Sequence, residues 1–182
     1  MTANVQTLAL LVKAAYRAGM REMNAALADL GLTAPQAEAL AVLAQAGPLS
    51  LNQLGGLLIA EGGHPSRLVD RLVQAGWVAR QEAADDRRRV TLRLTAAGAR
   101  LHAQAVQRTA PVLARFAERV EGEDVAAACA VLAASLHGTD LAEVVNRRLA
   151  GIADTTASGR TASPSAAATG SSTVQSAPGD PF

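Results

Sequence analysis

Residues 64–98 read HPSRLVDRLVQAGWVARQEAADDRRRVTLRLTAAG, and the rest of the chain is organised around them. The first part, 64–76, predicts a short amphipathic helix with leucines and valines on one face and polar residues on the other, ended by Gly76. Trp77–Gln81 and Arg89–Leu94 predict the two strands of a hairpin with the charged tip 85–89. Such a helix fits the major groove of a duplex, and such a tip reaches the minor groove or its phosphates.

Two capped helices are expected before this stretch. Thr33-Ala-Pro-Gln36 and Ser50-Leu-Asn-Gln53 both have capping-box spacing, and the second opens a helix expected to continue through Leu58. A tight glycine-bearing connection then leads to the 64–76 helix, which makes a helix-turn-helix, and the hairpin makes it winged. Two short helices and a turn also occur as plain core scaffold, so the arginines at the tip carry the DNA-binding interpretation.

Long helices are expected on both sides of this lobe. Residues 5–30 have apolar positions at helical spacing around more than one face, and further helices are expected from Thr95, from Gly122 and from Asp140 through Leu149. Cys129 belongs to an apolar stripe of the second of these and is interpreted as a small core residue. From Gly151 onward the composition is mostly Ala, Ser, Thr, Gly and Pro, which predicts a disordered tail.

The expected fold class is therefore mainly α with a small β-hairpin wing. The predicted divisions are an N-terminal dimerisation helix at 1–31, a winged helix-turn-helix lobe at 32–98, C-terminal dimerisation helices at 99–150, and the tail at 151–182.

Composition narrows the class of protein. The formal net charge is +1, but residues 64–100 hold eight arginines against four carboxylates, which is +4 and typical of a local nucleic-acid patch. A single cysteine excludes an internal disulfide and indicates a reducing compartment. Neither a secretory leader nor a membrane span is predicted, so a cytoplasmic protein is expected. The three histidines lack metal-ligand spacing, and no enzyme motif is present, so neither a cofactor nor catalysis is expected.

The blocks Ser66–Arg80, Asp86-Arg-Arg88 and Leu94-Thr-Ala-Ala-Gly98 together resemble the multiple antibiotic resistance regulator (MarR) family. The resemblance runs by motif over about Leu32–Leu101. It implies a homodimer with interlocking first and last helices and two winged-helix lobes on a palindromic operator of double-stranded DNA. It also implies small effectors, often phenolic or anionic, that bind between the lobe and the dimer helices and weaken DNA binding. Such a protein is most often a repressor.

The resemblance assigns roles in the predicted recognition helix. Ser66 and Arg67 stand where the family meets bases or phosphates, and Arg71 either contacts phosphate or pairs with Asp86 or Asp70. His64 contacts DNA or caps the helix. The chain departs from the family pattern just before, at Gly62-Gly63-His64-Pro65, where glycines and a proline disfavour helix, so the helix is expected to begin only near His64.

In the wing, Asp86-Arg87-Arg88 matches the family's Asp-x-Arg motif. Asp86 is expected to brace the hairpin and Arg88 to enter the minor groove, with Arg87 and Arg89 as neighbouring DNA contacts. Asp70 is also expected to be a brace, because a carboxylate facing phosphate is repelled.

Tyr16, Met20 and Met23 are candidate wall residues of the effector pocket, although stripe residues of a long helix are more often core. The rival function is a winged-helix protein-interaction module that does not bind DNA.

Overall fold

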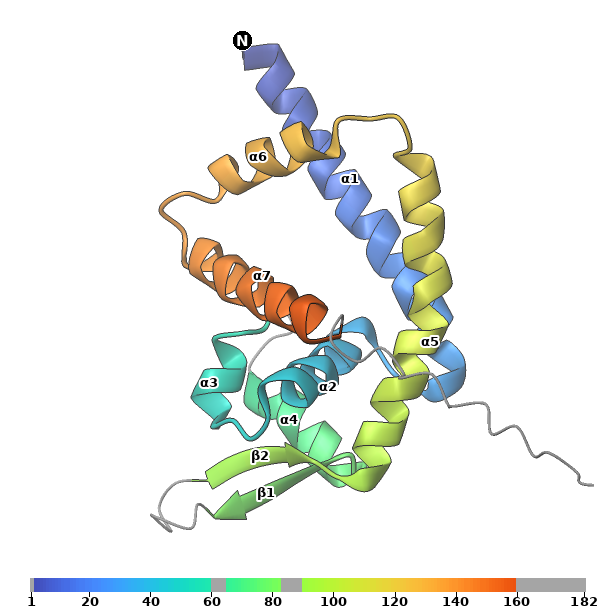
Figure 1. The fold of residues 1–182 in the computed structure, drawn as a ribbon, viewed down its shortest axis with the longest axis vertical. Coiled ribbons are helices and arrows are strands. Elements are labelled where there is room, and N and C mark those ends of the chain that lie inside the picture. Colours follow the sequence, from blue (N-terminus) through green and yellow to red (C-terminus); the bar gives the residue numbers. More distant parts are fainter. Residues whose placement is uncertain (1, 60–64, 83–89, 160–182) are drawn as a thin grey trace, which may run out of the picture.

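The computed structural model describes residues 2–59, 65–82 and 90–159. Its elements are listed here in chain order: α1 (Thr2–Leu27), the 3-10 turn η1 (Ala28–Leu30), α2 (Ala34–Ala46), α3 (Leu51–Gly55), α4 (Pro65–Gln74), β1 (Val78–Glu82), β2 (Val90–Leu94), α5 (Ala96–Arg119), α6 (Val125–Ser135) and α7 (Asp140–Gly159). Figure 1 shows α2, α3, α4 and the hairpin gathered in one lobe, and the long helices α1 and α5 running away from it. No helix in these ranges is both long enough and apolar enough to cross a membrane.

The lobe is held by one aliphatic core. Leu40, Leu54, Leu72 and Leu92 come from four different elements and are all fully or almost fully buried. Leu27, at the end of α1, is fully buried in the same core, which anchors α1 to the lobe. Complete burial of a leucine side chain contributes about 1.5–3 kcal/mol to folding, so these residues dominate the stability of the lobe.

Local capping sets where the first lobe helices begin. The Thr33 amide donates to Gln36 Oε1 at 2.9 Å, and the Ser50 amide donates to Gln53 Oε1 at 2.9 Å. In both cases the cap hydroxyl also accepts from the backbone of the glutamine, which completes the two predicted capping boxes. The helix starts at Ala34 and Leu51 therefore follow directly from the sequence.

The hairpin pairs antiparallel, with Val78 opposite Leu94 and Glu82 opposite Val90. Leu49 exchanges two backbone hydrogen bonds with Leu92, at 3.1 and 2.7 Å, and so joins β2 to the segment before α3. Behind the hairpin, an added Cβ on Gly98 would lie 1.9 Å from the Trp77 carbonyl oxygen. A glycine is required there because α5 begins in contact with the backbone that leads into β1.

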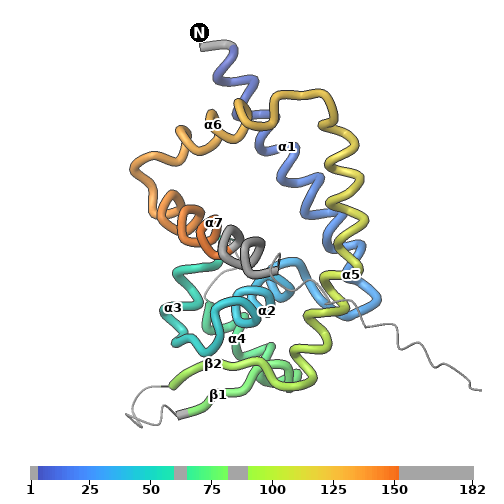
Figure 2. The backbone as a smooth tube through the Cα atoms, in the orientation of Figure 1, coloured from blue at the N-terminus to red at the C-terminus, as the bar shows by residue number. Residues whose placement is uncertain are grey.

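The helices outside the lobe expose many apolar residues. α1 packs along α5, and Figure 2 shows α6 crossing at the end of both, away from the lobe. The exposed large apolar residues of these helices are Val5, Leu8, Leu10, Leu11, Val12, Tyr16, Val106, Leu113, Phe116, Val125, Val131, Leu132, Leu141 and Leu149. A single chain leaves this surface uncovered.

Several expectations from the sequence need correction. α3 ends at Gly55, so Leu57 and Leu58 follow it instead of belonging to it, because the backbone of Gly56 closes the helix on Asn52 and Leu54. The first hairpin strand begins one residue later than expected, at Val78, and Arg89, the expected start of the second strand, lies outside the described residues. Cys129 is exposed and not a core residue, since α6 lies outside the lobe core and buries none of its residues in the single chain. α7 continues to Gly159, nine residues beyond the predicted end of the helical region at 150, and residues 160–182 lie outside the described ranges.

Candidate nucleic-acid interface

Helix α4 is amphipathic and turns its basic face outward. It begins at Pro65, a first-turn position that tolerates proline because no intrahelical amide bond is lost there. Val69 and Leu72 are fully buried against the lobe, whereas Arg67 and Arg71, placed one turn apart, are exposed. Gly76, with φ of 73°, ends the helix as expected. The helix can therefore approach a duplex with two arginines without disturbing the core.

The orientation of the hairpin relative to α4 is supported by an ion pair. Arg80 Nη2 of β1 lies 2.6 Å from Asp70 Oδ1 of α4. Both side chains are about half exposed, so the pair adds little stability, but it occupies the one carboxylate on the outer face of α4. The expectation that Asp70 is a brace is confirmed. Arg71 has no ion pair with any described residue and does not use Asp70.

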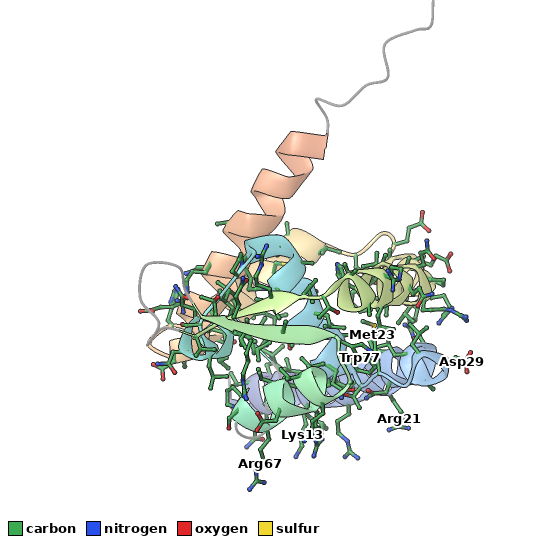
Figure 3. The ribbon with its side chains drawn as sticks, turned by 90° about the horizontal axis from the view of Figure 1, so that it is seen from below. Lys13, Arg21, Met23, Asp29, Arg67 and Trp77 are labelled. Carbon is green, nitrogen blue, oxygen red and sulfur yellow. The ribbon has the colours of Figure 1, made fainter. Side chains whose placement is uncertain are left out.

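Arg67 points away from the body of the molecule, on the same side as Lys13 and Arg21 of α1 (Figure 3). An open cavity of about 660 Å³ lies between α4, α1 and the start of α2. Its lining residues are Met20 and Asn24 of α1, Thr33, Pro35 and Gln36 at the start of α2, and Arg67, Leu68 and Arg71 of α4. Ser66 is half-buried in the first turn of α4. The basic face of α4 is thus continuous with α1 and the start of α2.

A second cavity, of about 330 Å³, lies where the lobe meets the long helices. Its walls come from α1, α2, α5 and α7, and they are formed by Met20, Met23, Ala34, Ala37, Glu38, Ala41, His102, Ala105, Val106, Thr109 and Arg148. Burial lowers the pKa of the His102 imidazole, which favours its neutral form. Most of the lining residues are apolar, and the charged groups among them are the guanidinium of Arg148 and the carboxylate of Glu38.

The positions predicted from sequence fall into three groups. Arg67, Arg71 and Ser66 lie together on α4 as described above. Met20 and Met23 line the second cavity. Tyr16 is 56% exposed and lines neither cavity, because it precedes Met20 on α1 and so lies further from the end of α1 that packs in the lobe. His64, Asp86, Arg87, Arg88 and Arg89 lie outside the described residues.

Four polar residues of the second cavity were not predicted as site residues: Glu38, His102, Thr109 and Arg148. Glu38 and Arg148 are 110 residues apart, and neither belongs to a recognisable motif. Their spacing in the sequence therefore could not predict that they lie close together in the fold. Within the described ranges no three His, Cys, Asp or Glu side chains are grouped so that they could hold a metal ion.

Comparison with known proteins agrees with this geometry. Residues 32–98 match a family model described as a winged helix DNA-binding domain. Over 69 residues the chain is 40% identical to the uncharacterized HTH-type transcriptional regulator YcgE of Bacillus subtilis. This match covers 38% of this chain and 45% of that protein. Over 88 residues the chain is 34% identical to the multiple antibiotic resistance protein MarR of Salmonella typhimurium. This second match covers 48% of this chain and 61% of that protein. The matches thus span about half the length of these curated relatives.

The overall fold is also found among solved structures. A crystal structure of a mutant MarR from E. coli complexed with operator DNA matches with a TM-score of 0.65 and 28% identity, over 73% of this chain and 96% of that one. The wild-type E. coli MarR without ligand matches with a TM-score of 0.59 at the same identity. Residues 32–98 thus match a winged helix DNA-binding domain, and the chain is similar to MarR in sequence over 48% of its length and in fold over 73% of it.

Proposed function

We propose that this chain is a homodimeric, effector-responsive transcriptional repressor that binds a palindromic operator in double-stranded DNA. The observation that carries the proposal is the exposed pair Arg67 and Arg71 on α4, a helix whose opposite face packs into a winged-helix lobe. The E. coli relative of the same fold has been crystallised with its operator, which supports the same use of the lobe here.

Contact with DNA is proposed through α4 and the tip of the hairpin. Arg67 and Ser66 lie in the first turns of α4, where a helix that enters the major groove meets base edges. Arg71 then contacts phosphate. At the tip, Arg88 is proposed to enter the minor groove beside Arg87 and Arg89, with Asp86 as brace, and His64 is proposed to contact DNA just before α4.

The homodimer is proposed because the exposed apolar residues of α1, α5, α6 and α7 form more apolar surface than a soluble chain usually leaves open. In a two-fold dimer, this apolar surface of one copy packs against the same surface of the other copy, so both are covered. It also places two α4 helices about one helical turn of DNA apart, which is why the operator is proposed to be palindromic.

The effector is proposed to bind in the cavity of about 330 Å³ lined by Met20 and Met23. The cavity has the apolar wall and the few polar groups that small-molecule sites share. Because its walls come from both the lobe and the long helices, a ligand there can alter how the lobe is held.

The test is a fluorescence-anisotropy titration of the full chain against mixed-sequence duplex DNA over a range of salt concentrations. Affinity should fall linearly with the logarithm of salt, and Arg88→Ala should reduce the slope by about one phosphate contact. Arg67→Ala should also cost about 1–3 kcal/mol of discrimination if it reaches a guanine, measured on a duplex selected by the wild-type protein from a random pool. Arg115→Ala, an exposed arginine on α5, is the control and should bind as wild type.

An absence of salt-dependent affinity for any duplex would contradict the proposal. It would favour the winged-helix protein-interaction module instead.

A further inference from the structure

Helix α1 carries a strip of positive charge that the proposed DNA contact does not use. This α1 strip consists of Lys13, Arg17 and Arg21, which are spaced by four residues and therefore share one face of the helix. All three side chains are exposed. From Lys13 to Arg21 the helix rises by about 12 Å. One strand of a duplex carries a phosphate about every 3.4 Å along the axis, so the strip is long enough to face about three or four of them.

No carboxylate neutralises the α1 strip within the described part of the chain. Glu22 is the one acidic residue of α1, and its two carboxylate oxygens accept from the guanidinium of Arg119 on α5 at 2.8 and 3.1 Å. The ion pairs among the described residues involve none of the strip residues. Like charges four residues apart repel each other and weaken a helix, so the strip does not serve the stability of α1. Its charge is available to an anion outside the chain.

The α1 strip lies on the same side of the molecule as the basic face of α4. Figure 3 shows Lys13, Arg21 and Arg67 along one edge, with their side chains pointing away from the body of the molecule. The two helices also share the walls of the open cavity of about 660 Å³, where Met20, the neighbour of Arg21, lines the same space as Arg67 and Arg71. A duplex that approaches α4 from this side therefore also approaches the strip.

The strip is separate from most of the apolar surface of α1 that the proposed dimer covers. Leu8, Val12 and Tyr16 are exposed, and each precedes a strip residue by five positions. At 3.6 residues per turn, five positions correspond to roughly 140° around the helix. Leu10 is on the side of the strip, but it lies about one turn before Lys13, nearer the N-terminus. A second copy that packs on the apolar side thus leaves the strip open.

We propose that the α1 strip binds the phosphate backbone of the same duplex that α4 contacts. The inference rests on the proposed function. Contacts from lysine and arginine to phosphate carry no base information, so the strip adds affinity and salt dependence without changing which operator is preferred. Arg67 differs, because a position in the first turns of α4 can meet base edges. The strip therefore sets how tightly the protein holds any duplex, and α4 sets which duplex it prefers.

The first test removes two charges of the strip. Glutamine is a good helix former, so Arg17→Gln combined with Arg21→Gln should leave α1 folded. The slope of the logarithm of affinity against the logarithm of salt concentration should become shallower by about two, because two phosphate contacts are lost. The affinity should fall by the same factor for mixed-sequence DNA and for a duplex selected by the wild type. Arg67→Ala, by contrast, should lose more on the selected duplex.

Two further double variants are the controls. Arg115→Gln combined with Arg147→Gln removes two exposed arginines from α5 and α7, so it changes the net charge equally and should keep the wild-type slope. Arg17→Lys combined with Arg21→Lys keeps both strip charges and should also keep the slope, because lysine binds phosphate as a point charge. The proposal is wrong if the glutamine variant of the strip keeps the wild-type slope, or if the α5 and α7 variant loses as much.

Sedimentation equilibrium of the same strip variant distinguishes the duplex from a rival partner, the carboxylates of a second copy of the chain. Unchanged self-association together with a shallower salt slope supports the duplex. Weaker self-association with an unchanged salt slope would place the strip in the contact between copies and overturn the proposal.

Lys13 provides a second test, because it is the only lysine in the sequence. Its acetylation by an N-hydroxysuccinimide ester, measured by mass spectrometry, reports how accessible the ammonium group is. A saturating amount of the selected duplex should slow this acetylation severalfold, and an equal rate with and without the duplex overturns the strip. If the wild type binds no duplex at all, the proposed function fails. If it binds but the strip variant keeps its slope and Lys13 stays reactive, the strip alone fails.

Discussion

Helices α2 and α6 are both rich in apolar residues, but they have opposite surroundings. α2 buries Ala39, Leu40, Val42 and Leu43 in the lobe. α6, with the sequence VAAACAVLAAS, contains a single polar residue and buries none of its side chains. A helix that is apolar on all sides is normally covered by other protein. The comparison teaches that one chain covers the apolar residues of α2 but not those of α6, and the uncovered helix is what supports the proposed dimer.

The largest expected effect lies on the α2 side of this comparison. Leu40→Ala removes a fully buried side chain and should lower the free energy of unfolding by about 2–5 kcal/mol, because the cavity left behind cannot collapse. Urea denaturation followed by circular dichroism measures the loss. A loss below about 1 kcal/mol would show that the lobe core is not the stable half of the molecule.

A second substitution probes the junction between the lobe and the long helices. Gly98→Ala should cost about 3 kcal/mol, because the new Cβ would meet the Trp77 backbone oxygen at 1.9 Å and neither backbone can yield cheaply. Gly19→Ala, in α1, is the control, because its Cβ would meet nothing within 4 Å. That variant should be stabilised by about 0.5–1 kcal/mol. Equal thermal-unfolding midpoints for the two variants would argue against the close contact.

Leu132→Glu is a direct test of α6. Of these substitutions it should have the smallest effect on the unfolding of the lobe. Leu132 is 41% exposed in the single chain. If a second copy covers it, a buried unpaired carboxylate should weaken dimerisation by about 1–3 kcal/mol, or roughly tenfold to a hundredfold in Kd, while lobe unfolding is unchanged. Sedimentation equilibrium measures the association, with Glu123→Gln as the control. Unchanged association would remove α6 from the interface.

The sequence predicted local structure well where a few neighbouring residues decide it. The two capping boxes, the glycine stop at Gly76 and the amphipathic face of α4 all depend on contacts within four residues, and all are present in the structure. The end of α3 was predicted too late, because Leu57 and Leu58 continue the apolar spacing although the backbone turns at Gly56.

The candidate site was predictable only in part. Arg67 and Arg71 were found because helical spacing alone places them together on the open face of α4. The family resemblance directed attention to Met20 and Met23, and both line the second cavity. Cys129 was misjudged because an apolar pattern states that a residue favours burial, but not whether the same chain supplies the cover.

By itself, the sequence determined the helices, the hairpin and the basic face of the winged-helix lobe, because these depend on periodicity, capping and charge along short stretches. The tertiary structure alone decided which distant residues meet. Glu38 and Arg148 are 110 residues apart, and only the docking of α7 on the lobe brings them to 3.0 Å beside Ile59. It also decided which apolar helix is covered, since burial depends on the packing of elements that sequence spacing does not relate.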